Sequence, residues 1–165
     1  MPVYNVSFSQ HGARLVLNCF LAGSGANAPT SITAPSALYV ALLTGTATDV
    51  DTGGGFTEFT GYSGTNRQAI IFSPAVLSAA ANTAQRIPSF NAQSFSITSS
   101  ATISGIAITT VQSNATALNY LAGGNVIWYG ELTTGTPPSQ TATTVAVVNT
   151  DTLTFSAGNI TIDLY

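Results

Sequence analysis

Short segments in which apolar residues alternate with Ser and Thr fill the chain from residue 94 onward. Gly, Asn and Pro separate them, and alternation over a few residues is the pattern of a half-buried strand. The apolar run at residues 37–43 suits a strand buried on both faces. The pattern predicts an all-β fold, a jelly roll or β-sandwich, and argues against a parallel α/β fold. We expect strands at residues 37–43, 67–72, 94–98, 102–110, 125–132, 143–148, 152–155 and 159–164.

One early segment has helical periodicity instead. Apolar residues recur at three- and four-residue spacing over residues 9–22, where Ser9 is suited to cap the start and Gly23 to end it. This spacing predicts one short N-terminal helix, preceded by an arm at residues 1–8. Residues 45–64 contain six glycines and are predicted to form a long Gly-rich loop.

Charged side chains make up 5% of the 165 residues, against about 25% in an average domain. The chain has no lysine, and its three arginines are too dispersed for a nucleic-acid interface. No apolar window approaches the length of a membrane span, and the single Cys19 excludes an intrachain disulfide. We therefore expect one β-sandwich domain, residues 1–165, that binds neither nucleic acid nor membrane.

Candidates for catalysis are few. His11 is the only histidine, and Cys19 lies eight residues further along the predicted helix, so the two need not share a face. Glu58 and Glu131 could pair for glycoside hydrolysis, but the sequence does not place them together. We expect no enzyme activity, no catalytic residue and no small-molecule substrate.

Metal and cofactor motifs are also incomplete. Asp49 and Asp51 begin like a calcium loop, but Gly53 stands where the EF-hand pattern has a third ligand. The three glycines at residues 53–55 are followed by no lysine and no helix, so they do not make a phosphate loop. We therefore expect neither a metal site nor a bound cofactor.

Four blocks in this order and spacing resemble a family of small tailed-phage virion proteins. They are Leu38-Tyr39-Val40-Ala41-Leu42, Arg67-Gln68-Ala69, the segment from Val126 to Leu132 and the segment from Leu153 to Leu164. Proteins of this family are often labelled tail-fibre-like, and some relatives look like jelly-roll cement or decoration proteins on the capsid exterior. The chain departs from that pattern in the longer segment before Arg67.

The resemblance implies a non-enzymatic virion protein on the outer surface of the capsid. Its partners would be the major capsid protein, whose subunits it would bridge, and further copies of itself, with a trimer as one arrangement. The arm at residues 1–8 and the loop at residues 45–64 are the expected contact segments. Arg67 and Arg86 are candidates for intermolecular ion pairs, with a hydrogen bond inside the chain as the equal alternative.

The alternative is a tail or tail-fibre component that binds a host-surface receptor. In that case we expect the aromatic side chains of Phe56, Phe59 and Tyr62 to face solvent and to contact the receptor, for which a saccharide is the expected chemistry. The two hypotheses therefore predict different surroundings for the same loop.

Overall fold

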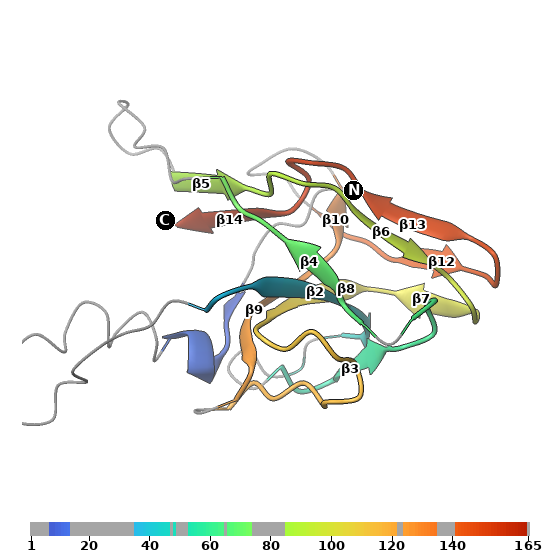
Figure 1. Cartoon of the computed structure of the whole chain (residues 1–165), viewed down its shortest axis with the longest axis horizontal. Helices are drawn as coiled ribbons and strands as arrows, with labels where there is room; N and C mark the ends of the chain where they lie inside the picture. The colour runs from blue at the N-terminus through green and yellow to red at the C-terminus, as the bar shows by residue number, and fades with distance from the viewer. Residues whose placement is uncertain are drawn as a thin grey trace, which may run out of the picture.

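The computed structural model describes residues 7–13, 35–46, 48, 53–64, 66–73, 85–121, 124–134 and 141–164. Within these ranges the chain consists of antiparallel strands and irregular connections, with one helical turn at residues 10–13 (Figure 1). The predicted all-β fold class is confirmed. The jelly-roll topology stays a prediction, as does the single domain spanning residues 1–165.

A six-stranded antiparallel sheet forms the larger layer (Figure 1). Its strands run in the order β1 (Ser7–Phe8), β9 (Val126–Glu131), β8 (Gly105–Thr109), β2 (Leu38–Gly45) and β3 (Phe56–Phe59), and β4 (Gln68–Ile70) also pairs with β2. One edge of β2 pairs with β8. Its other edge pairs with two strands, the first three residues of β2 with β4 and the last four with β3.

The second layer is a two-stranded antiparallel ribbon made of three successive strand pairs. These are β5 (Gln85–Pro88) with β14 (Thr161–Leu164), β6 (Gln93–Ser96) with β13 (Thr152–Phe155), and β7 (Ala101–Ile103) with β12 (Val145–Val147). Residues 85–103 thus run along residues 145–164 for the length of the ribbon. A short further pair, β10 (Thr133–Thr134) with β11 (Thr141–Ala142), lies where the chain leaves the sheet.

The main hydrophobic core lies between the sheet and the ribbon. Side chains from both layers form it, and its largest buried members are Leu42, Phe95, Ile103, Ile106, Ile108, Leu132, Phe155 and Ile160. Alternate residues of β2 point the other way, so Ala41 and Leu43 join a second cluster with Tyr120 and Tyr129 on the far face of the sheet. The prediction that residues 37–43 form a strand buried on both faces is therefore confirmed at its centre.

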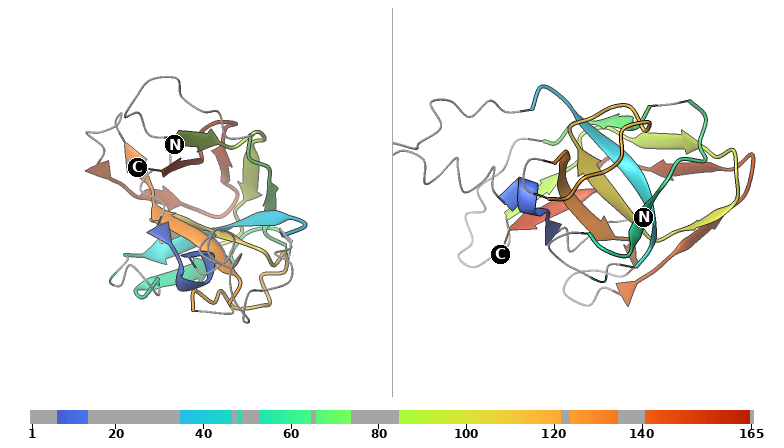
Figure 2. Two further views of the ribbon diagram at one scale, coloured as in Figure 1. Left: turned by 90° about the vertical axis from the view of Figure 1, so that its left-hand side faces the viewer. Right: turned by 90° about the horizontal axis from the view of Figure 1, so that it is seen from below.

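Figure 2 shows the sheet and the ribbon from two further sides. Backbone hydrogen bonds and isolated bridges join the two layers at their edges. Between β3 and β4, Tyr62 bridges to Ile97, and just after β4 Phe72 bridges to Ser89 of the ribbon. At the end of β9, the Leu132 N–H donates to the Ser104 carbonyl, 2.8 Å away. The core between the layers is thus enclosed by backbone on two sides.

The prediction of one continuous Gly-rich loop at residues 45–64 is wrong in its middle, because β3 lies within it and pairs with β2. The glycines serve as turn residues: Gly45, Gly53 and Gly55 all have positive φ, and the Thr48 N–H donates to the Gly54 carbonyl at 2.7 Å. Four residues were enough for a strand once a neighbour supplied its hydrogen bonds.

At the N-terminal end of the described chain, the Ser9 hydroxyl accepts the Gly12 N–H at 3.0 Å, so the predicted cap is confirmed. The predicted helix at residues 9–22 lies outside the described residues beyond its first turn. Of the predicted arm at residues 1–8, only Ser7 and Phe8 are described. They pair with β9, so this part of the arm belongs to the chain's own sheet.

Candidate functional site

The strongest electrostatic feature of the described chain is a buried ion pair. The Arg67 side chain is fully buried and the Glu58 side chain is 10% exposed. Arg67 Nε and Nη2 donate to the two carboxylate oxygens of Glu58, each at 2.7 Å. Nη1 also donates to the Val111 carbonyl at 2.9 Å and Nη2 to the Thr116 carbonyl at 2.7 Å. One guanidinium therefore ties β3 to the loop that follows β8.

This geometry decides between the two predictions for Arg67. The hydrogen bond inside the chain is confirmed, and an intermolecular ion pair is wrong for this residue because its donors are spent on Glu58 and two carbonyls. Arg86 lies on β5, where the backbone register puts it opposite Asp163. Its side chain lies outside the described residues, so its intermolecular pairing stays a prediction.

The buried charge also affects two neighbouring tyrosines. Burial is the largest cause that raises the pKa of Tyr120 above its ordinary value, and the nearby Glu58 carboxylate adds to the shift. The same two causes raise the pKa of Tyr62. Both phenols therefore stay neutral at physiological pH, which suits core side chains.

The loop aromatics do not form a receptor-binding surface. Phe59 is 8% exposed and Tyr62 3% exposed, and both belong to the main core. Phe56 is half-buried and its ring meets the edge of Tyr129 with centroids 6.0 Å apart. The expectation that these three side chains face solvent is wrong, because β3 carries them into the chain's own packing.

The two glutamates proposed as a glycosidase pair lie in one row across the sheet. Glu58 is opposite Leu43, Leu43 is opposite Gly105, and Gly105 is opposite Glu131. Three inter-strand spacings separate the Cα atoms of Glu58 and Glu131 by about 14 Å. Glycosidase carboxyls stand within about 10 Å of each other, and the ion pair with Arg67 engages Glu58 besides.

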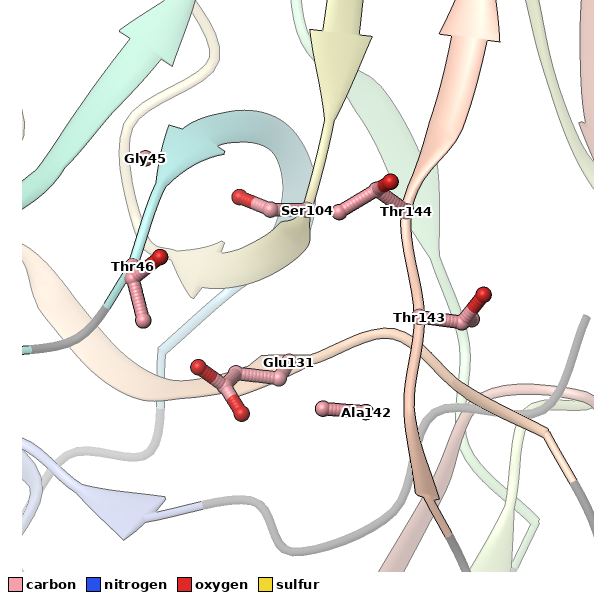
Figure 3. Close-up of a pocket in the computed structure, with 7 residues that line it drawn as sticks. All are labelled: Gly45, Thr46, Ser104, Glu131, Ala142, Thr143 and Thr144. Carbon is pink, nitrogen blue, oxygen red and sulfur yellow. The ribbon is translucent and has the colours of Figure 1, made fainter.

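Glu131 lies at a polar hollow with a volume of about 340 Å³ (Figure 3). We call it the Glu131 hollow, and it is lined by Gly45, Thr46, Ser104, Glu131, Ala142, Thr143 and Thr144. The ends of β2 and β9, the residue before β8 and the segment after β11 bring these residues together. Glu131 was a candidate acid, and Gly45 and Thr46 lie in the expected contact segment at residues 45–64. The other lining residues carry no motif, and their contacts join distant segments, so the sequence did not point to them.

Two residues with exposed apolar side chains, Ile71 and Phe90, are joined by a backbone hydrogen bond. Phe90 is 69% and Ile71 58% exposed, and the Phe90 N–H donates to the Ile71 carbonyl at 2.6 Å. The Asn91 side chain holds the backbone around Ile71 in place. Its Oδ1 accepts the Ile71 N–H at 2.8 Å, and its Nδ2 donates to the Ala69 carbonyl at 3.0 Å. An exposed aromatic and aliphatic pair on a rigid backbone suits a protein contact.

Of the remaining candidate residues from the sequence, the structure describes His11 only. His11 is half-buried in the helical turn, where its backbone N–H donates to the Tyr120 carbonyl at 3.3 Å. Cys19, Asp49 and Asp51 lie outside the described residues. Within the described ranges, no group of three or more His, Cys, Asp or Glu side chains could hold a metal ion. No helix in that part of the chain is long and apolar enough to cross a membrane.

A protein family described as podophage GP4 fiber I protein gp80 matches residues 7–163. The chain belongs to this fiber I protein family. The match covers nearly the whole chain, including the sheet, the ribbon and the Glu131 hollow. Membership confirms the expected resemblance to tailed-phage virion proteins and makes the chain a structural protein of a phage virion. No curated protein matches the chain.

Proposed function

We propose that this protein is a non-enzymatic component of a virion fibre, held on the phage tail by contacts with other proteins. The observation that carries the proposal is the family match over residues 7–163, whose description names a fiber protein. It favours the tail alternative over the cement role at the capsid surface. Under the cement role the partner would be the major capsid protein.

The chemistry of the fold supports a binding role rather than catalysis. One glutamate is engaged by Arg67, and the register separates it from the other. The strands make their backbone hydrogen bonds to one another and so form a rigid body. Ser and Thr side chains on its surface can make neutral hydrogen bonds to neighbouring proteins. Fibre attachment needs such a body more than it needs a reactive group.

Self-association is part of the proposal, with the Ile71 and Phe90 pair as the contact that supports it. Sedimentation velocity on Ile71→Ser/Phe90→Ser should give a smaller particle than the wild type. Val148→Ser is the matched control, because Val148 is an exposed apolar residue (54%) elsewhere in the chain, directly after β12. An unchanged size in the double variant would remove this pair from the interface.

Copy number tests the location. Quantitative mass spectrometry of purified virions should give a ratio to the major capsid protein far below one, and the protein should stay with tails when heads and tails are separated. A ratio near one, with the protein on separated heads, would refute the fibre role and support cement.

A further inference from the structure

Glu131 is the described side-chain carboxylate that lacks a partner. Glu58 pairs with Arg67, and Asp151 accepts the Val148 N–H at 2.8 Å. Glu131 makes no hydrogen bond or ion pair to any residue that the structure describes, although it is half-buried at the wall of a hollow. A surface carboxylate in open water needs no partner, but one in a concave site is positioned to receive a ligand.

Glu131 is the one ionisable residue among the described residues that line the Glu131 hollow, so the charge at the hollow is negative. The Glu131 carboxylate can only accept hydrogen bonds, and the hydroxyls of the lining Ser and Thr residues can accept as well as donate. Figure 3 shows the carboxylate and the hydroxyls of Thr46 and Ser104 around the hollow, with the Ala142 methyl facing it. A negatively charged site with an apolar wall fits a donor-rich cation on an aliphatic stem.

This chain has little to supply that cation itself. It contains no lysine, and of its three arginines Arg67 is buried in the pair with Glu58. Its net charge of −3 also favours a basic partner. We propose that the Glu131 hollow binds a lysine or arginine side chain carried by another polypeptide. The proposal deepens the fibre role, on which it rests, by naming the chemistry of the protein contact.

A neutral saccharide fits this hollow less well. Sugar hydroxyls both donate and accept but carry no charge, so a neutral sugar leaves the Glu131 carboxylate without a counter-charge. Ammonium and guanidinium groups only donate, with three and five N–H bonds respectively. A saccharide is therefore the competing ligand that the experiment has to separate.

The test titrates the purified, isotope-labelled protein with single amino-acid amides and follows backbone amide resonances by NMR. N-acetyl-arginine amide and N-acetyl-lysine amide should shift the resonances of residues 45, 46, 104, 131 and 142–144, and salt should weaken the effect. N-acetyl-citrulline amide has nearly the shape of the arginine probe without its charge and should leave these resonances unmoved. The tighter of the two cationic probes identifies the preferred side chain.

Glu131→Gln keeps the shape of the side chain and removes its charge. It should weaken the cationic probe about tenfold or more, the usual consequence of losing a charged hydrogen-bond acceptor. Asp151→Asn is the matched control, because it makes the same change of net charge outside the hollow, and it should bind like the wild type. Equal binding by Glu131→Gln, binding of citrulline amide, or shifts with methyl glycosides but not with the cations would overturn the proposal.

Virions carrying the same two variants extend the test to the assembled particle. Glu131→Gln should be released by salt at lower concentration than Asp151→Asn. Carbodiimide cross-linking adds a direct readout: this chain has no lysine, so any lysine joined to Glu131 belongs to a different protein. Salt release of both variants at the same concentration would contradict the proposal. A failure of the fibre role would appear separately, in the copy number and in the separated heads.

Discussion

Glu58→Gln should be the most informative single substitution for stability. It keeps the size of the side chain but leaves the Arg67 charge at 1% exposure without its counter-charge. The guanidinium donates two hydrogen bonds to the Glu58 carboxylate and two to backbone carbonyls. The amide can accept from one guanidinium nitrogen but cannot restore the charge.

Removing one partner of a buried ion pair costs about 3–5 kcal/mol, because the remaining charge stays desolvated. Domains have total stabilities of about 5–15 kcal/mol, so the variant should lose a large part of its stability. For a domain of this size that loss lowers Tm by roughly 6–20 °C. In the double variant Glu58→Gln/Arg67→Met, the cost should fall short of the sum of the single costs by about 2 kcal/mol, because no buried charge remains to be compensated.

Urea unfolding, followed by circular dichroism and by the fluorescence of the single Trp128, measures these costs. Glu131→Gln is the matched control: it makes the same chemical change at an unpaired carboxylate and should cost less than about 0.5 kcal/mol. A cost for Glu58→Gln below about 1 kcal/mol, or one equal to that of Glu131→Gln, would refute the reasoning. The pair would then behave like an exposed salt bridge.

Three further predictions concern local structure. Gly53→Ala should destabilise the fold by at least about 1 kcal/mol more than Gly64→Ala in urea titrations, since both have positive φ but only at Gly53 would a Cβ lie 2.5 Å from the Tyr120 ring; equal costs would contradict this packing. The raised pKa values of Tyr62 and Tyr120 contribute stability that is fully present below about pH 10 and is lost as pH rises through the folded values, because unfolded tyrosine ionises first. The unfolding free energy should therefore fall between pH 9 and pH 11, and fall less in the variant with both tyrosines changed to Phe; an unchanged slope would exclude these groups. Ser9→Ala should cost about 1–2 kcal/mol in the same assay, because the cap of the helical turn is lost; an unchanged midpoint would argue against the cap.

The alternating segments allowed much of the fold to be predicted. Residues 37–43 and 125–132 both contain central strands of the sheet, since a long apolar run has few other places in a small β protein. The strand at Phe56–Phe59 was missed because the surrounding glycines indicated a loop, and its pairing with β2 was not visible in four residues. Tertiary pairing overrode the local composition there.

The site was less predictable than the fold. Arg67 was recognised as a candidate for bidentate pairing, but its partner Glu58 was considered only as a catalytic acid. The Glu131 hollow depends on segments nearly 100 residues apart, such as Thr46 and Thr143. No pattern in the sequence encodes where the ends of three strands meet, so the hollow itself could not be predicted.

The ribbon has a consequence for how the protein is made. Each strand of residues 85–103 pairs with a strand of residues 145–164, and these pairs carry Phe95, Ile103 and Phe155 into the core. Contacts at this sequence separation are slow to form, because the chain between them must first be closed into a large loop. During translation the core must therefore stay open until residue 164 has left the ribosome. The closure of this large loop is therefore a slow step of folding, and its rate can limit the supply of assembly-competent subunits.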